Sequence, residues 1–314
     1  MRHHGVLPPA LPGPRASIET KAGRVCLYGS AEADGVPLLL VHSINAAASA
    51  YEVRPLYLHD RPRRPVYALD LPGYGLSERA RRVYTPRTMT DAIHAVAAEI
   101  RTRHGGARVD AVALSLSASY LARAVTERPD DYRALVLISP TGFDRLLAGR
   151  GPDGGVRGSE RARAILDSRL LGPALFGVLV SRPSMRYFLR KTFGSKRIDE
   201  GLFDYDQLSA HQPGARHAPC CFLSGLLFPT DATTLYEALT LPVLMLHGQR
   251  GDFVDFRDAP RFAARPNWTI RSLPTGAFPH FEDLATVTGL CDEFFASLPS
   301  PVASPDQLIR QRDS

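Results

Sequence analysis

Apolar residues in this chain occur mainly as short continuous runs that end in small or polar residues. A strand with one exposed face alternates apolar and polar residues, whereas a continuous run fits a strand buried on both faces. Such runs predict strands of a parallel sheet covered by helices, at residues 37–43, 65–75, 109–115, 134–140, 241–248 and 269–274. The segment 16–29 alternates instead, and it predicts an antiparallel hairpin at the edge of that sheet.

Helical periodicity fills the intervals between the predicted strands. Met89, Ile93, Val96, Ala97 and Ile100 recur at the spacing of one helix face. Residues 116–127 and 281–297 also predict helices. Alternation of strands and helices predicts an α/β domain with a mostly parallel central sheet flanked by helices.

The alternation stops between residues 142 and 232. A glycine-rich stretch, "GRGPDGGVRG", precedes helix-like segments that include "SERARAILDSRLLGPALFGVLVS" and "SMRYFLRKTF". Residues 145–228 hold 13 Arg and Lys against 7 Asp and Glu, so they carry the whole net charge of +6. Two interpretations stay open: a solvated arginine surface, or attraction for an anionic substrate or surface.

These patterns predict a division of the chain into one core domain and one helical insertion. We expect a lead-in at 1–15, a core at 16–141 and 233–298, a helical cap at 142–232 after the sixth strand, and a tail at 299–314.

Composition narrows the functional classes further. No apolar run approaches the roughly 18 residues of a membrane span, and the N-terminus has no signal-peptide pattern, so we expect a cytoplasmic protein. The four cysteines form no CxxC pair, which favours free thiols. Arg and Lys show no pattern of a recognition helix or of interleaved aromatic residues, so we expect no nucleic-acid partner.

The candidate nucleophile lies in the stretch "AVALSLSAS", residues 111–119. A predicted strand ends at Leu114 and a helix is expected to begin near Leu116, which leaves Ser115 on a sharp turn with small residues, Ala113 and Ser117, two positions away on each side. This is a relaxed form of the G-x-S-x-G turn that exposes a serine at the carboxyl edge of a sheet. A serine needs a base to attack, so the signal requires partners elsewhere.

Those partners follow two later strands. "LMLHGQRGDFVD" offers Asp252 and "LPTGAFPHFEDL" offers His280. Together with "LLLVHSINAAAS" (38–49) and "ALDLPGYGLSER" (68–79), this order of serine, acid and histidine resembles the α/β-hydrolase family, in its capped branch with a serine nucleophile. The resemblance covers about residues 16 to 298 except the insertion.

The resemblance implies a role for each residue. Ser115 would attack a carbonyl carbon, His280 would move the proton, and Asp252 would orient the imidazole. The amides of Ile44 and Leu116 would bind the oxyanion. The expected substrate is a small molecule, most simply a carboxylic ester, with an apolar acyl or alcohol part. Candidate substrate-binding residues are Ser43, Asn45, Phe176, Leu179 and Phe222.

Several alternatives remain open from the sequence. Asp255 competes with Asp252 as the acid, and Asp144 is a more remote choice. The same triad serves C–C bond hydrolases, thioesterases and acyltransferases, and a non-catalytic ligand-binding or signalling protein can share the fold. No metal-ligand spacing and no nucleotide fingerprint occurs, so we expect neither a metal ion nor a cofactor. The sequence does not determine the oligomeric state.

Overall fold

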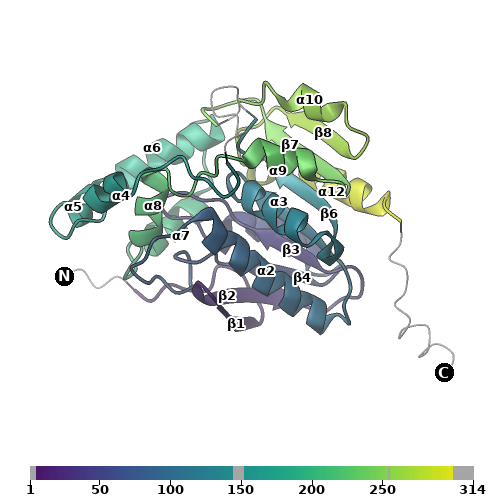
Figure 1. Ribbon diagram of the computed structural model, residues 1–314, viewed down its shortest axis with the longest axis horizontal. Coiled ribbons are helices and arrows are strands. Elements are labelled where there is room, and N and C mark those ends of the chain that lie inside the picture. The colour runs from purple at the N-terminus through teal and green to yellow at the C-terminus, as the bar shows by residue number, and fades with distance from the viewer. Residues whose placement is uncertain (1–4, 144–151, 254, 300–314) are drawn as a thin grey trace.

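The computed structural model describes residues 5–143, 152–253 and 255–299. Within these ranges eight strands form one sheet in the order β1-β2-β4-β3-β5-β6-β7-β8 (Figure 1). The strands are β1 (Arg15–Thr20), β2 (Gly23–Ser30), β3 (Leu38–Val41), β4 (Val66–Leu69), β5 (Val109–Leu114), β6 (Tyr132–Ile138), β7 (Val243–Gly248) and β8 (Trp268–Leu273). The neighbouring pairs from β4 to β8 are parallel, and β2 pairs antiparallel with both β1 and β4. The mostly parallel sheet that the sequence predicted is therefore confirmed.

The central strands are buried on both faces, which explains their continuous apolar composition. In β5, Ala111 and Ala113 contribute to one hydrophobic cluster, and Val112 and Leu114 contribute to a second. Side chains alternate between the two faces of a strand, so each face packs against its own layer. By contrast, β1 alternates exposed and half-buried residues, as expected of an edge strand.

Helices cover both faces of the sheet. The first cluster contains apolar residues of α2 (Pro86–Arg103), α3 (Ser117–Glu127), α9 (Ala232–Ala238) and α10 (Ala259–Ala263). The second contains residues of α1 (Arg54–Asp60) and α12 (Leu284–Ala296). In Figure 1, α2, α3 and α9 lie in front of the sheet. The predicted face of α2, from Met89 to Ile100, is fully buried.

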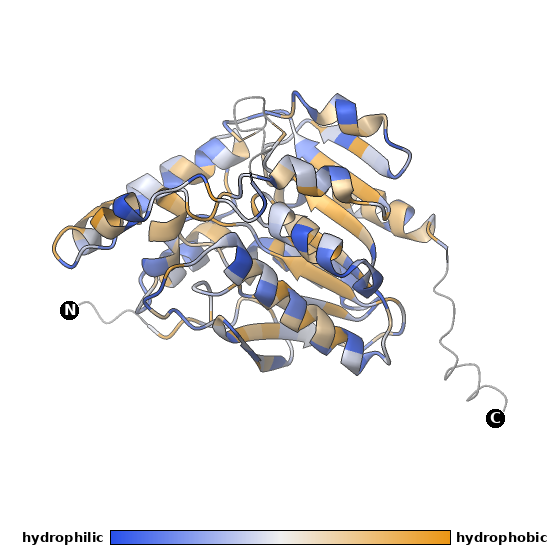
Figure 2. Cartoon of the chain, viewed as in Figure 1, coloured by the Kyte–Doolittle hydropathy of each residue, from blue (hydrophilic) through white to orange (hydrophobic). Residues whose placement is uncertain are grey.

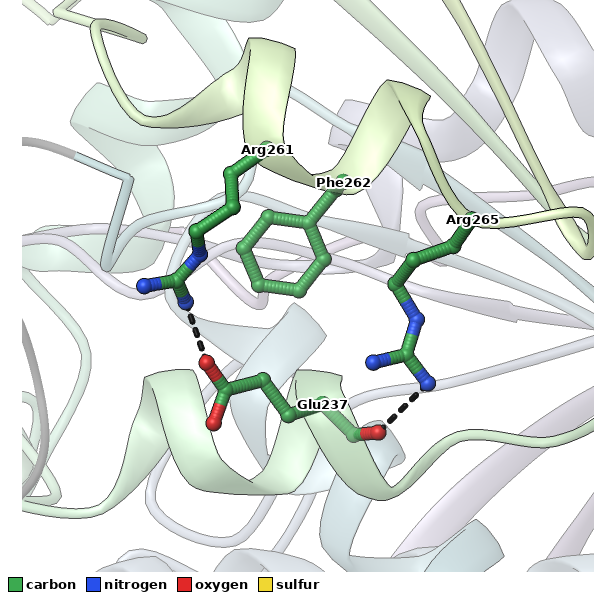
Figure 3. A pocket seen from close by; sticks show the side chains of 4 residues that line it. All are labelled: Glu237, Arg261, Phe262 and Arg265. Atoms are coloured by element: carbon green, nitrogen blue, oxygen red, sulfur yellow. Dashed lines mark hydrogen bonds and ion pairs between the residues drawn. The ribbon is translucent and has the colours of Figure 1, made fainter.

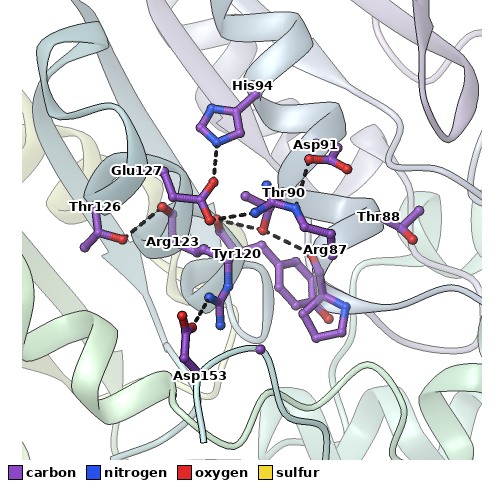
Figure 4. Close-up of polar contacts among 12 residues, drawn as sticks. Arg87, Thr88, Thr90, Asp91, His94, Tyr120, Arg123, Thr126, Glu127 and Asp153 are labelled. Atoms are coloured by element: carbon purple, nitrogen blue, oxygen red, sulfur yellow. Dashed lines mark hydrogen bonds and ion pairs between the residues drawn. The ribbon is translucent and has the colours of Figure 1, made fainter.

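Polar contacts join α2 to α3 at the rim of this layer (Figure 4). His94 Nε2 lies 2.8 Å from a carboxylate oxygen of Glu127, and Arg87 donates to the other oxygen at 2.6 Å. Thr90 donates its hydroxyl to the carbonyl oxygen of Tyr120 at 3.4 Å. These contacts fix α3, the helix that follows Ser115, against α2.

The predicted helix over 281–297 is instead two helices. α11 (Pro279–Glu282) ends at Asp283, whose side chain accepts a hydrogen bond from the amide of Thr286 and caps α12. The residue that caps a helix has non-helical backbone angles, here a φ of −140° and a ψ of 68°, so the chain turns at Asp283. His280 consequently lies in a short helix of its own.

A group of helices follows the sixth strand, as predicted, and we call it the helical insert. It comprises α4 (Glu160–Leu166), α5 (Gly172–Leu179), α6 (Arg182–Phe193), α7 (Glu200–Ala210) and α8 (His217–Leu223). Met185, Leu189 and Phe193 bury one face of α6 in the second cluster, and Ala218 and Cys221 of α8 belong to the first. In Figure 1, α4 and α5 extend away from the body of the molecule.

Two further expectations concern membranes and disulfides. No helix in the described ranges combines the length and the apolar composition that crossing a bilayer needs. All four cysteines, Cys26, Cys220, Cys221 and Cys291, are free thiols, as the sequence predicted.

Candidate active site

Ser115 occupies a strained turn directly after β5. Its φ is 51°, in the left-handed region that a non-glycine residue enters at a cost of roughly 1–2 kcal/mol. The Ser115 amide donates to the carbonyl oxygen of Ile138 on the neighbouring strand β6 at 2.9 Å, and its carbonyl accepts from the amide of Ala118 at 3.2 Å. Ala113 and Ser117 are fully buried on either side. The chain thus holds the serine at the carboxyl edge of the sheet, in the conformation of a nucleophile turn.

The loop after β3 is organised around a buried carboxylate. Glu52 lies in the 3₁₀ turn η1 (Ala50–Val53) and is completely buried. It accepts hydrogen bonds from the Ser43 amide at 2.7 Å and from Asn45 Nδ2 at 2.6 Å. Asn45 Oδ1 in turn accepts from the Ala47 amide at 2.8 Å. The polar groups of the two predicted substrate-binding residues in this loop, Ser43 and Asn45, therefore bind within the loop itself.

The amides predicted to form the oxyanion hole are those of Ile44 and Leu116. Both residues are buried, at 4% and 2% exposure. Among the described residues neither amide has a hydrogen-bond acceptor, although buried amides are nearly always satisfied. The two amides have donor capacity that a substrate oxygen could use.

His42 supports this loop with both of its ring nitrogens. Nδ1 lies 2.6 Å from the Ser43 carbonyl oxygen, which requires this nitrogen to donate, and Nε2 accepts from the Leu71 amide at 2.9 Å. Burial lowers its pKa to about 4. His42 is thus neutral and fully engaged with the backbone.

His280 is the predicted base, and its ring is fully buried. Nε2 lies 2.7 Å from the carbonyl oxygen of Glu52, so Nε2 carries the hydrogen and the lone pair resides on Nδ1. Nδ1 has no partner among the described residues. Burial lowers the pKa of His280 to about 4, and the hydrogen bond to Glu52 only partly offsets this effect. The imidazole is therefore neutral near pH 7, as a base must be.

Asp252 lies on the loop after β7 and has another partner. Its carboxylate forms an ion pair with Lys191 Nζ of α6 at 2.8 Å, and its side chain is 52% exposed. The competing Asp255 pairs with Arg257, and Asp144 lies outside the described residues. Among the described residues no hydrogen bond joins Ser115, Asp252 and His280 to one another.

The end of α6 packs between the loops that carry these two residues. The Thr192 carbonyl accepts from the Ala277 amide at 2.8 Å, next to the histidine helix. Phe193 contacts Phe278 and Phe281 edge-on, on either side of His280 in sequence. The helical insert thereby fixes both loops in the arrangement described.

Three groups that the sequence analysis missed lie in this region. Asp206 of α7 is buried, with 3% exposure, and its Oδ1 is unpartnered among the described residues. Burial, and then the charge of Glu52, raise its pKa well above the usual range. Burial likewise raises the pKa of Glu52 to about 7. Ser139 follows β6 with a φ of 46° and a buried, unpartnered hydroxyl. The only sequence signal for Ser139 was the proline that directly follows it at the end of the strand.

The space between the core and the insert is small. A crevice too narrow to hold a water molecule is lined by Ala46, Ala47, Gly73, Tyr74, Arg79, Ser209 and Ala215. Ligand pockets usually enclose about 300–1,000 Å³. Arg79, one of its lining residues, donates to the Ser209 carbonyl of α7 at 2.7 Å and so bridges the core and the insert. The described arrangement is thus a closed one.

A larger surface hollow lies between α9 and α10 (Figure 3). Its lining residues are Glu237, Arg261, Phe262 and Arg265, and none of them is a candidate site residue. Both arginines turn toward Glu237 in Figure 3: Arg261 pairs with its carboxylate and Arg265 donates to its carbonyl at 2.7 Å. The hollow offers no nucleophile, and it holds two guanidinium groups beside one carboxylate.

The predicted apolar lining residues separate into two places. Phe222 stacks on Phe228, with ring centroids 5.3 Å apart, and packs against the first cluster. Phe176 of α5 packs against the second cluster, and Leu179 is half-buried. Within the described residues no group of three His, Cys, Asp or Glu side chains could hold a metal ion.

Comparisons with known proteins agree with this architecture. A family model described as the alpha/beta hydrolase family matches residues 38–288, and the chain therefore belongs to that family. No curated protein matches the chain. A serine hydrolase involved in carbazole degradation is 15% identical, with a TM-score of 0.68, over 90% of this chain and 98% of that one.

Two further solved structures have similar folds. A meta-cleavage product hydrolase from Pseudomonas fluorescens is 16% identical, with a TM-score of 0.67, over 90% of this chain and 97% of that one. A thermophilic esterase from Thermogutta terrifontis is 18% identical, with a TM-score of 0.66, over 90% and 98%. At these identities the likeness establishes the fold alone, so the reaction has to be argued from the site.

Proposed function

We propose that this protein is a serine hydrolase that cleaves a carboxylic ester without a cofactor, with Ser115 as the nucleophile. The observation that carries the proposal is the strained backbone of Ser115, at a φ of 51°, directly beside the acceptor-free amide of Leu116. Strain of this kind persists where the surrounding structure maintains it, and it concentrates at functional sites.

The proposed reaction follows from these groups. His280 takes the proton of Ser115 Oγ as this oxygen attacks the ester carbonyl carbon, and the carbonyl π electrons move to oxygen. The amides of Ile44 and Leu116 donate to that oxyanion, each contributing about 3 kcal/mol. The tetrahedral intermediate collapses to an acyl-enzyme and releases the alcohol, which takes a proton from the base. Water, deprotonated by the same base, then releases the acid and restores Ser115.

His280 is the proposed base and Asp252 its proposed orienting acid. In the closed arrangement Nε2 is held by Glu52 and Asp252 by Lys191. Catalysis therefore requires either that the free lone pair on Nδ1 accept the proton or that the ring turn and release Glu52. Because α6 contacts both loops, a movement of the helical insert would free them together.

The same movement would admit a substrate. The insert, residues 142–232, would then act as a cap over the site. The crevice beside Gly73 and Arg79 is too narrow for an ester with an apolar acyl or alcohol part. Phe176, Leu179 and Phe222 are the proposed apolar contacts of the opened site. The structurally similar proteins include both an esterase and a hydrolase of meta-cleavage products. Cleavage of a C–C bond is therefore the alternative reaction at the same serine.

A second candidate function is ligand binding without turnover. The specific observation in its favour is that His280 and Asp252 each have a partner other than each other. On this alternative, Ser115 and the two amides would hold a carbonyl or carboxylate oxygen without reacting with it.

Hydrolysis of short-chain aryl esters by the wild type, Ser115→Ala and His280→Asn distinguishes these functions. The wild type should turn over, and Ser115→Ala should lose activity by up to a millionfold, as expected when a residue acts within a concerted unit. A comparable loss in His280→Asn assigns the base. Unchanged turnover in Ser115→Ala rejects the proposed nucleophile. Ligand binding to a folded wild type that shows no turnover on esters or C–C substrates favours the second candidate.

A further inference from the structure

The outer end of the helical insert exposes a group of apolar side chains, which we call the apolar tip. In Figure 2 the helices that extend from the body carry apolar residues along much of their length. The exposed fractions are 61% for Ile165, 90% for Leu170, 57% for Leu171, 48% for Leu175 and 72% for Val178. These residues fall within fourteen consecutive positions of α4, α5 and the turn between them.

Single exposed leucines are common on protein surfaces, but a contiguous group marks a site of interaction. α5 reads GPALFGVL and contains no charged residue. Only Gly172 of this helix is buried, so α5 is apolar around most of its circumference yet covered on one side only. A short helix depends on packing of its apolar face, and here most of that face has no protein partner among the described residues.

Positive charge flanks the apolar tip. Residues 168–198 contain seven basic residues and no acidic residue. Three of the seven pair with acids: Arg182 with Asp204, Arg186 with Glu200 and Lys191 with Asp252. Arg169, Arg190, Lys196 and Arg197 form no ion pair among the described residues.

We propose that the apolar tip docks this protein on an anionic phospholipid surface. α5 would lie in the plane of the interface with Leu170 and Val178 in the acyl region, and the flanking arginines would contact lipid phosphates. A second copy of the chain is the less favourable occupant, because a symmetric contact would bring two acid-free basic segments together. The proposal goes beyond the proposed function and does not depend on turnover.

Co-sedimentation with lipid vesicles tests the docking. Wild type should bind vesicles of phosphatidylcholine with about 30% phosphatidylserine roughly tenfold or more tightly than phosphatidylcholine alone, and salt of about 0.5 M should weaken the binding. The double variant Leu170→Glu with Val178→Glu should lose binding to the anionic vesicles. Leu58→Glu, an exposed leucine of α1, is the matched control and should bind like wild type.

Charge is tested separately with Arg169→Gln and Arg190→Gln combined, which should weaken binding to anionic vesicles about tenfold and leave the apolar tip intact. Absence of wild-type binding to anionic vesicles, or equal binding to both vesicle types, overturns the proposal. So does a dimer, detected by light scattering, that Leu170→Glu with Val178→Glu converts to monomer. Ester hydrolysis is a separate readout, so failure here leaves the test of Ser115 unaffected.

Discussion

The imidazole of His280 donates from Nε2 to the backbone carbonyl oxygen of Glu52, 2.7 Å away and 228 positions earlier in the chain. This bond links the helix after the last strand to the turn that carries the buried Glu52 carboxylate. The same carboxylate binds the loop of the proposed oxyanion amide. The proposed base and the proposed oxyanion loop therefore belong to one buried hydrogen-bonded unit.

Burial of His280 predicts the acid limb of the activity profile. A base works only when unprotonated, so activity is present above its pKa and falls as the pH drops through it. Burial lowers the pKa of His280 to about 4 from 6.5, so kcat/KM should stay level from neutral pH to about pH 5 and decline near pH 4. Stopped-assay kcat/KM against pH checks this. An acid limb near 6.5 would show that a solvated histidine, or another group, is the base.

Three variants assign the acid. Asp252→Asn should reduce turnover strongly, on the order of the 10⁴-fold that follows loss of a triad acid in the best-studied proteases. Lys191→Met removes the competing partner of Asp252 and should not reduce turnover, because the ion pair is exposed. Asp255→Asn is the matched control, since Asp255 pairs with Arg257. A strong loss in Asp255→Asn alone would transfer the role to that residue.

Strain at Ser115 predicts an unusual order of stabilities. Glycine adopts a φ of 51° without the steric cost that a Cβ incurs, so Ser115→Gly should be more stable to urea than Ser115→Ala by about 1 kcal/mol. Glycine at an ordinary exposed loop position gains no such advantage over alanine. Urea denaturation of the two variants measures the difference. An alanine variant that is the more stable of the two would mean that the turn is relaxed in solution.

A buried ion pair ties α3 to the end of the insert. Arg123 donates to both carboxylate oxygens of Asp231, at 2.7 and 2.6 Å, with side-chain exposures of 8% and 4%. Arg123→Met leaves the Asp231 carboxylate buried without its counter-charge and should destabilise the fold by about 3 kcal/mol. Arg123 also bonds Asp153 (Figure 4), which is 90% exposed, so Asp153→Asn should leave the melting temperature unchanged. Equal effects of the two variants would contradict this ranking.

The sheet was predictable because burial imposes its pattern directly on composition. Strands buried on both faces are apolar at nearly every position, as Val109–Leu114 shows with Asp110 as its one charged residue, and the edge strand Arg15–Thr20 alternates. The sharp turn at Ser115 was predictable for a similar reason, since the residues two positions away are small. Such local constraints are visible in a single sequence.

The partners of the site residues were not predictable in this way. The bond of His280 to Glu52 ends on a backbone carbonyl, which every residue possesses. The pairing of Asp252 with Lys191 depends on where α6 ends relative to the loop after β7. The apolar composition of α5 did not reveal that Leu175 and Val178 are exposed, because exposure depends on what packs against the helix. Each outcome depends on long-range packing of the insert.

The most direct measurement of the central claim is covalent labelling by a fluorophosphonate, followed by mass spectrometry of the peptides. Attack by Ser115 Oγ forms the oxygen–phosphorus bond and expels fluoride. We predict one adduct, on Ser115, that persists in Ser139→Ala, the second serine with a positive φ at this sheet edge, and is lost in Ser115→Ala. A folded protein that remains unlabelled, or a label on any other residue, would contradict the proposed nucleophile.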